Sequence, residues 1–319
     1  MPLFDLPLAQ LYAYRAVSEP PADLADFWRR TLDESRALAA PPRATAVDTV
    51  VRGVRTRDVE FSGFGGHPIR AWLHTPREGD TSAVVVRYQG YGSGRGLAHE
   101  IPLEVHAGYT TLVMDNRGQG GVHAVGDTPD PVGSGPSAPG FLTRGLASPD
   151  DHYYRRLLAD AVLAVDAALA LTGATRAAVR GGSQGGALAL AAAALHPAVA
   201  AATVDVPFLT DLPRALDLAS TSPYDELPRF FASQRTLREQ ALRTLSYSDV
   251  ANLAPMATCP ALFSVALLDA VCPPSTVFAA FHRHGGADKD IVIYPDNGHE
   301  GGGAVQDERG IRWLRERLA

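Results

Sequence analysis

The chain has 319 residues, of which 46% are hydrophobic and 20% charged, a balance typical of folded globular proteins rather than disordered or fibrous ones. This length accommodates one large α/β domain with insertions or two ordinary domains. The formal net charge is −6 and the 29 basic residues are scattered along the chain, which argues against binding of nucleic acid or another polyanion.

The N-terminus carries prolines and an aspartate where a signal peptide needs a basic region and an apolar run. No stretch reaches the roughly 18–20 uninterrupted apolar residues that a membrane span requires. We therefore expect a soluble cytoplasmic protein without membrane contact. Cys259 and Cys272 are the only cysteines, too few for a disulfide framework, and both are predicted to be small buried residues.

The first predicted elements are a helix and a hairpin. Leu24, Phe27, Trp28 and Leu32 recur at helical spacing, which predicts an amphipathic helix over 23–38, part of a helical extension at the N-terminus. Short β-like runs between residues 50 and 76 are separated by Gly63-Phe64-Gly65-Gly66. This pattern predicts an antiparallel hairpin.

Continuous apolar runs then alternate with helical patterns, which predicts a mostly parallel central sheet flanked by helices. The runs lie at 83–86, 111–114, 177–179, 261–265 and 291–294. Crossover helices are expected at 97–107, 184–195, 274–284 and 304–318. A longer helix before the third run should be capped by Ser148, carry Asp150 and Asp151 in its first turn, and end at Gly173.

Two stretches interrupt this alternation within what we predict to be one domain over residues 1–319. Residues 122–141 form a long loop rich in proline, glycine and serine, and a long ordered loop in a compact domain usually has a function. We expect it to be a protruding oligomer contact. Residues 210–250 read as helical pieces inserted before the strand at 261–265, which we predict to be a cap over the active site.

The segment Gly181-Gly182-Ser183-Gln184-Gly185 carries the decisive motif, Gly-x-Ser-x-Gly, between an apolar strand and a helix rich in alanine and leucine. In the nucleophile elbow of α/β-hydrolases the flanking glycines allow a tight strand-to-helix turn, which exposes the serine hydroxyl. The alternative is a glycine-rich turn with a bystander serine. The placement predicts the α/β-hydrolase fold with Ser183 as nucleophile.

A serine nucleophile needs an imidazole base, and the base needs a carboxylate that fixes its tautomer. Asp269 directly follows the run at 261–265, and His299 follows the run at 291–294, so the chain order Ser, Asp, His is the one this fold uses. The rivals to His299 are His282 and His284, which lie on a helical pattern. Asp296 and Asp288 are the rivals to Asp269.

A tetrahedral intermediate also needs hydrogen-bond donors for its oxyanion. One should be the main-chain N–H of Gln184, and the other should come from the glycine-rich loop at 89–96. That loop could instead be a flexible turn or a phosphate cradle, but it lacks the lysine of a P-loop. The histidines and cysteines show no zinc-like spacing, so we expect no metal site and no cofactor.

Together these motifs resemble the acetyl xylan esterase and cephalosporin C deacetylase family of carbohydrate esterases (family 7), over nearly the whole chain. The resemblance rests on Arg117-Gly118-Gln119, on the Ser183 motif and on His299-Glu300, supported by Gly90-Tyr91-Gly92, Thr143-Arg144-Gly145 and residues 271–278. It implies the triad Ser183, Asp269 and His299, with the amides of Tyr91 and Gln184 as oxyanion hole. Arg117, Gly118, Gln119 and Glu300 are then supporting residues.

The resemblance also implies a substrate class and an assembly. The family removes short acyl groups, chiefly acetyl, from sugars and cephalosporin-type alcohols, and it forms a hexamer, a dimer of trimers, to whose interface loop residues 122–141 correspond. Phe208, Pro223 and Tyr224 are candidate walls of the acyl pocket, and each could equally be core packing. Arg87 and Gln89 depart from the family, in which more apolar residues are common there.

The function predicted from the sequence is therefore a serine carboxylesterase acting on acetylated xylo-oligosaccharides and cephalosporin C. An acyltransferase or perhydrolase on the same triad, with another nucleophile in place of water, is the alternative within enzymes. A non-catalytic α/β-hydrolase scaffold is the alternative outside them, which the presence of all three triad residues disfavours.

Overall fold

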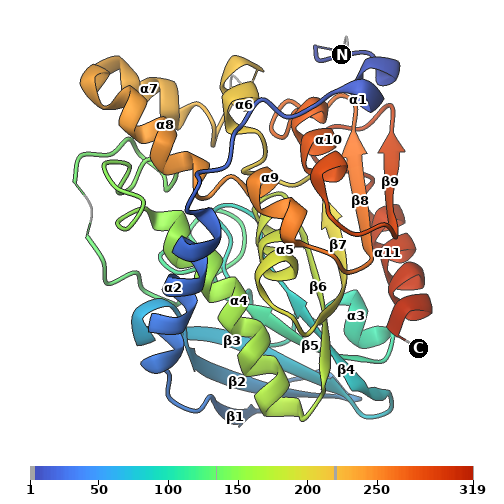
Figure 1. Cartoon of the computed structure of the whole chain (residues 1–319). Helices are drawn as coiled ribbons and strands as arrows, with labels where there is room; N and C mark the ends of the chain where they lie inside the picture. Colours follow the sequence, from blue (N-terminus) through green and yellow to red (C-terminus); the bar gives the residue numbers. More distant parts are fainter. Residues whose placement is uncertain (1–3, 134, 219–220, 319) are drawn as a thin grey trace.

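The computed structural model describes residues 4–133, 135–218 and 221–318. Within these residues one nine-stranded sheet has the order β1-β2-β3-β5-β4-β6-β7-β8-β9 (Figure 1). The strands are β1 Arg43–Val47, β2 Val54–Ser62, β3 Pro68–Pro76, β4 Asp80–Arg87, β5 Tyr109–Met114, β6 Arg176–Gly182, β7 Val199–Asp205, β8 Ala261–Ala266 and β9 Lys289–Tyr294.

Strand pairing divides the sheet into an antiparallel and a parallel part. The pairs β1·β2, β2·β3 and β3·β5 are antiparallel, so the predicted hairpin is confirmed as β2 and β3. From β5 through β4, β6, β7 and β8 to β9 every pair is parallel. The carboxyl ends of the parallel strands therefore lie along one edge, where sheets of this kind bind their ligands.

Helices cover both faces of this sheet. They are α1 Leu8–Ala13, α2 Leu24–Ala37, α3 Leu103–His106, α4 Tyr153–Thr172, α5 Gln184–Leu195, α6 Leu212–Leu218, α7 Glu226–Ser233, α8 Arg238–Ser246, α9 Val250–Leu253, α10 Pro274–Arg283 and α11 Gly303–Leu318. Short 3₁₀ turns occupy Phe64–Gly66, Arg235–Leu237 and Ala254–Met256.

Alternate residues of β4 show how the two faces are filled. Val84 and Val86 belong to the large core that contains α4 and α5, whereas Ala83 and Val85 belong to a smaller core with Leu314 of α11. Successive side chains of a strand point to opposite faces. Helices α4 and α5 thus cover one face and α11 the other, which confirms the predicted α/β-hydrolase architecture.

Three details differ from the sequence prediction. The predicted helix at 97–107 shrinks to α3, which begins only after Pro102. Helix α4 starts at Tyr153 with His152 at its N-cap position, so Ser148 is not its cap, and Asp150 and Asp151 precede its first turn. The Ser148 hydroxyl accepts a hydrogen bond from the Asp150 amide in the preceding turn. Strands β1 and β7 lie outside the predicted runs; the alanines of β7 carry little β propensity.

The two segments predicted to interrupt the strand–helix alternation are helical at 210–250 and irregular at 122–141 in their described residues. In the described part of 210–250 the chain forms α6, α7 and α8, which lie at the end of the molecule to which the arrowheads of β7 and β8 point (Figure 1). No strand or helix is formed by the described residues of 122–141. Residues 134, 219 and 220 fall outside the described residues.

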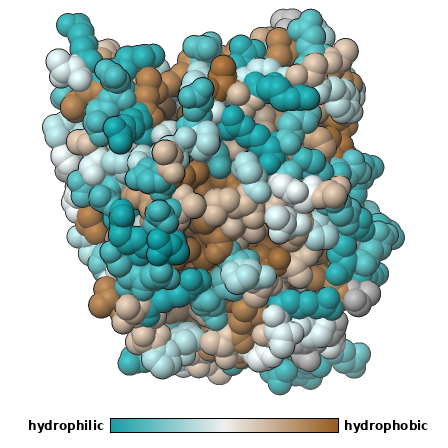
Figure 2. All heavy atoms as spheres, viewed as in Figure 1, coloured by the Kyte–Doolittle hydropathy of each residue, from teal (hydrophilic) through white to brown (hydrophobic). Residues whose placement is uncertain are grey.

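Hydrophobic residues gather near the middle of the face shown in Figure 2, and hydrophilic residues surround them. None of the helices in the described ranges is both long and apolar enough to cross a membrane.

Candidate active site

Ser183 lies in a strained turn between β6 and α5. Its φ of 58° and ψ of −122° are unusual for a residue with a side chain, as the nucleophile elbow requires. A Cβ at Gly181 would lie 2.3 Å from the main-chain carbonyl carbon of Gly185, and one at Gly185 would lie 2.6 Å from the carbonyl oxygen of Tyr88. Both glycines of the motif are therefore required by space.

The two side chains predicted to act with Ser183 lie beside it. His299 Nε2 is 3.0 Å from Ser183 Oγ, and His299 Nδ1 is 2.9 Å from Asp269 Oδ2. Asp269 is fully buried, and its Oδ1 accepts hydrogen bonds from the amides of Val271 and Cys272. The His299 side chain is 35% exposed, so this chain of three groups opens to solvent at the histidine.

The rival histidines and aspartates have other partners. His282 Nδ1 and His284 Nε2 lie 2.9 Å from the carbonyl oxygens of Tyr14 and Cys259 respectively. Asp288 pairs with Arg317 on the surface, and Asp296 is exposed. The Glu300 carboxylate accepts hydrogen bonds from Asn297 and from the Gly298 amide, so it braces the loop that carries His299.

The amides of Tyr91 and Gln184 come from two loops that one side chain connects. Gln119 Nε2 donates to Gln184 Oε1 at 3.0 Å, and Gln119 Oε1 accepts from the Gly92 amide at 2.7 Å. Tyr153 Oη also accepts from Gln119 Nε2, at 2.8 Å. Gln119 therefore fixes the spacing between the turn after Ser183 and the loop at 89–96.

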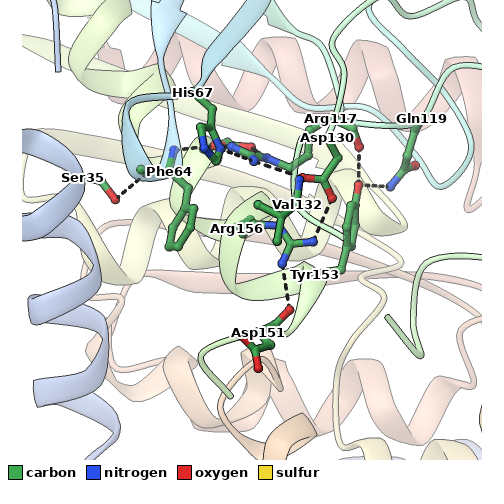
Figure 3. Close-up of polar contacts among 12 residues, drawn as sticks. Ser35, Phe64, His67, Arg117, Gln119, Asp130, Val132, Asp151, Tyr153 and Arg156 are labelled. Atoms are coloured by element: carbon green, nitrogen blue, oxygen red, sulfur yellow. Dashed lines mark hydrogen bonds and ion pairs between the residues drawn. The ribbon is translucent and has the colours of Figure 1, made fainter. Parts of the chain in front are cut away.

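The neighbouring Arg117 is held in a buried ion-pair network (Figure 3). Its guanidinium forms a two-pronged contact with Asp160 of α4, with Nη2 2.7 Å from Oδ1, and both side chains are fully buried. Asp130, from the 122–141 segment, accepts from Arg156 at 2.8 Å and lies 3.4 Å from Arg117. Tyr153 Oη donates to the Arg117 carbonyl oxygen at 2.7 Å, which links this network to Gln119.

Charge and burial set the pKa values in this network. Burial alone would raise the pKa of Asp130, but the hydrogen bond from Arg156 and the charges of Arg156 and Arg117 hold it below its ordinary value. Burial and the charge of Arg117 lower the pKa of His67, whose ring lies next to the same guanidinium.

Gly118 lies in the left-handed region with φ 67°, and a Cβ there would lie 3.2 Å from the Cβ of Asp130. A side chain at position 118 would therefore strain the turn and crowd Asp130.

A cavity of about 190 Å³ opens beside Ser183 and His299, and the polar residues in its lining include Arg87, Arg180, Asp205, Gln306 and Asp307. Arg87 and Arg180 both pair with the buried Glu104, at 2.9 and 3.1 Å. Burial raises the pKa of Asp205, which accepts from Gln306 at 2.7 Å. Apart from Arg87, these cavity residues were not among the sequence predictions, since they meet only when β6, β7 and α11 pack together.

The three candidate acyl-pocket residues are buried away from this cavity. Phe208 and Tyr224 are fully buried with ring centroids 4.6 Å apart, and Pro223 is buried as well. The Phe208 amide donates to the carbonyl oxygen of Ser183. Phe208 thus lies against the nucleophile turn with Tyr224 packed on it, and the part of all three residues in an acyl pocket stays a prediction.

Comparison with known proteins adds a family to this geometry. The family model of acetyl xylan esterases (AXE1) matches residues 1–317. The chain belongs to this family. Its members are carboxylic ester hydrolases, and the family resemblance predicted from the motifs is therefore confirmed.

Two solved structures and one curated protein are similar. The acetyl xylan esterase of Paenibacillus sp. R4 is 33% identical, with a TM-score of 0.89 over 98% of this chain and 100% of that one. Acetyl xylan esterase 1 of Thermoanaerobacterium sp. JW/SL YS485 is 34% identical, with a TM-score of 0.87 over 99% and 98%. The acetyl esterase Axe7A of Xylanibacter ruminicola is 27% identical over 289 residues, which are 88% of this chain. This chain spans 63% of the length of that protein.

Cys272 lies close to Asp269 and His299. Ligand atoms of Asp269, Cys272 and His299 all lie within 4.8 Å of one another, a group that could hold a metal ion. Cys272 is fully buried, and burial raises the pKa of its thiol well above the ordinary value. Cys259, also predicted to be buried, is partly exposed.

Proposed function

We propose that this protein is a serine esterase that removes short acyl groups, chiefly acetyl, from acetylated sugars. The observation that carries the proposal is the hydrogen-bonded chain from Ser183 Oγ through His299 to the buried Asp269. Membership of the acetyl xylan esterase family supports the reaction class, as do the two solved structures named above, which are acetyl xylan esterases.

In the first half of the reaction His299 Nε2 accepts the Ser183 proton as Oγ attacks the ester carbonyl carbon. Asp269 accepts the hydrogen bond from Nδ1–H, so it fixes the tautomer and stabilises the imidazolium. The amides of Tyr91 and Gln184 donate to the oxyanion of the tetrahedral intermediate. Its collapse breaks the bond to the alcohol oxygen, and the alcohol leaves with the proton from Nε2.

In the second half water replaces the alcohol. His299 removes a proton from water as its oxygen attacks the acyl-enzyme carbonyl. The second tetrahedral intermediate then collapses, the bond from the acyl carbon to Oγ breaks, and Oγ takes the proton back from Nε2, which releases acetate and restores the Ser183 hydroxyl. The cavity beside Ser183 and His299 suits an alcohol that carries further hydroxyl groups, since Arg87, Asp205 and Asp307 in its lining offer donors and acceptors.

Acetylated xylo-oligosaccharides and cephalosporin C are the substrates we propose. The hexameric ring with residues 122–141 at its interface is part of the same proposal, as is the cap formed by 210–250. A cytoplasmic location stays a prediction. Transfer of the acyl group to an added alcohol or to peroxide would use the same acyl-enzyme, so product analysis with those acceptors measures how far they compete with water.

The test is acetate release from acetylated xylo-oligosaccharide and cephalosporin C, beside p-nitrophenyl esters of rising acyl length. Ser183→Ala should lower kcat by at least about 1,000-fold on every ester, because the nucleophile is removed. Ser62→Ala, at the end of β2 and outside both the 210–250 segment and the cavity beside Ser183, is the matched control and should keep full activity. Unchanged turnover in a folded Ser183→Ala protein would refute the proposal, and preference for long acyl chains would refute the acetyl specificity.

A further inference from the structure

Glu226 is a buried carboxylate at the start of α7, within the 210–250 segment. Only 3% of the residue is exposed. Its Oε1 accepts a hydrogen bond from the phenol of Tyr91, and its Oε2 accepts one from the Leu142 amide at 2.8 Å. One side chain thus joins α7, the loop at 89–96 and the chain that follows the 122–141 loop.

The space around this carboxylate is shaped for it. Gly140 has φ 122°, and a Cβ there would lie 2.1 Å from Glu226 Oε1. Within the described ranges Glu226 forms no ion pair with an arginine or lysine. Burial raises its pKa to about 7, although the hydrogen bond from Tyr91 opposes that rise. A carboxylate held without a counterion is costly, so its hydrogen bonds must be well formed.

Tyr91 connects this carboxylate to the proposed chemistry. Its phenol oxygen also accepts from the Phe141 amide at 2.7 Å, and its ring lies edge-on to Phe141 and Phe208, at 5.4 and 6.2 Å. The main-chain amide of the same residue is a proposed oxyanion donor. No hydrogen bond from that amide to another described residue is present, so it is free to donate to a ligand.

We propose that Glu226 is a positioning residue for ester hydrolysis, because it holds the Tyr91 phenol from the 210–250 segment and thereby sets the place of the Tyr91 amide. This inference rests on the proposed function. An oxyanion donor works only within a few tenths of an ångström of its productive place, and a side chain anchored at its far end restrains the main chain that carries it.

The experiment measures kcat and KM on p-nitrophenyl acetate at pH 8.5 for Glu226→Gln, Tyr91→Phe and the double variant. Each single variant should lower kcat about tenfold with KM within about twofold of wild type, less than the 100-fold or more for loss of an oxyanion donor, because the amide is displaced and not removed. The double variant should lose no more than either single one, since both act through the same hydrogen bond.

Asp166→Asn is the control. The Asp166 carboxylate on α4 also has fixed partners, since it lies 2.9 Å from both Arg36 Nε and His196 Nε2, but it is outside the 210–250 segment and does not contact Tyr91. Its replacement should change Tm without changing kcat.

Three results overturn the inference: kcat of folded Glu226→Gln within twofold of wild type, losses that multiply in the double variant, or an equal kcat loss in Asp166→Asn. Where Glu226→Gln does not fold, Tyr91→Phe decides, and wild-type kcat in that variant overturns the inference. Ser183→Ala separates the two proposals, because activity in that variant refutes the serine mechanism itself.

Discussion

Two clusters of paired arginines and carboxylates lie on opposite faces of the sheet. The Arg117 cluster comprises Arg117, Asp130, Arg156 and Asp160, and it faces α4. The Arg180 cluster comprises Arg87, Glu104, Arg180 and Asp307, and it faces α11. The two clusters differ in their access to solvent.

Every member of the Arg117 cluster is buried, with side chains no more than 5% exposed. In the Arg180 cluster Asp307 is 43% and Arg87 32% exposed, and three of the four residues line the cavity beside Ser183. The first cluster can only brace the loops, whereas the second can also meet a substrate. The charged groups of the Arg117 cluster therefore brace the fold, whereas those of the Arg180 cluster line the cavity beside Ser183.

The largest effect on stability is expected when the Arg117 cluster is broken. Arg117→Ala leaves Asp160 as a buried carboxylate without its guanidinium partner, which should cost about 3–5 kcal/mol in the free energy of unfolding. Urea denaturation at pH 7 measures it. Arg312→Ala, which removes an exposed pair with Glu308 on α11, is the control and should cost less than about 0.5 kcal/mol. Equal effects of the two changes would contradict the comparison.

A smaller effect, dependent on pH, is expected at Asp130. Asp130→Asn should cost about 1–3 kcal/mol near neutral pH, because Arg156 loses its ionised partner. The arginines lower the pKa of Asp130, so its contribution is present above the ordinary value of 3.8 and is lost as the pH falls through the lower value in the folded protein.

Urea denaturation of both proteins from pH 8 to pH 3 checks this. The stability difference between wild type and Asp130→Asn should stay constant from about pH 8 to 5 and shrink below about pH 4. A difference that grows on acidification would show that the carboxyl group binds its proton more tightly in the folded protein, opposite to our assignment.

The smallest change in stability is expected at the cavity wall. Asp307→Asn leaves Arg180 paired with Glu104, so unfolding should change by less than about 1 kcal/mol. Because Asp307 lines the cavity, KM for an acetylated xylo-oligosaccharide should change more than KM for p-nitrophenyl acetate. A loss of several kcal/mol, or equal KM shifts for both esters, would place Asp307 with the bracing residues instead.

The local motifs were readable because their chemistry is contained in short stretches. Gly181 and Gly185 flank Ser183 in the sequence, and the structure shows the close contacts that exclude a side chain at both. Asp269 and His299 could be selected because each follows an apolar strand. The structure brings both into one hydrogen-bonded chain with Ser183, and their catalytic roles remain our proposal.

Errors occurred where a local pattern had more than one outcome. Ser148 followed by acidic residues fits a helix cap, but its hydroxyl accepts from Asp150 in a turn, and α4 begins five residues later. Strand β7 was not among the predicted apolar runs, because its alanines carry little β propensity. A short local pattern therefore did not fix where α4 begins, and it did not distinguish β7.

The sequence by itself determined the alternation of strands and helices, the nucleophile turn, the order of the three polar residues and the family. Apolar periodicity, steric limits on glycine and strand-end positions act over a few residues, so they are visible in a linear pattern. Only the tertiary structure placed Glu226 against Tyr91, Arg180 against Glu104 and Cys272 beside His299. Such contacts depend on strand order and helix packing, which bring together side chains that no local rule relates.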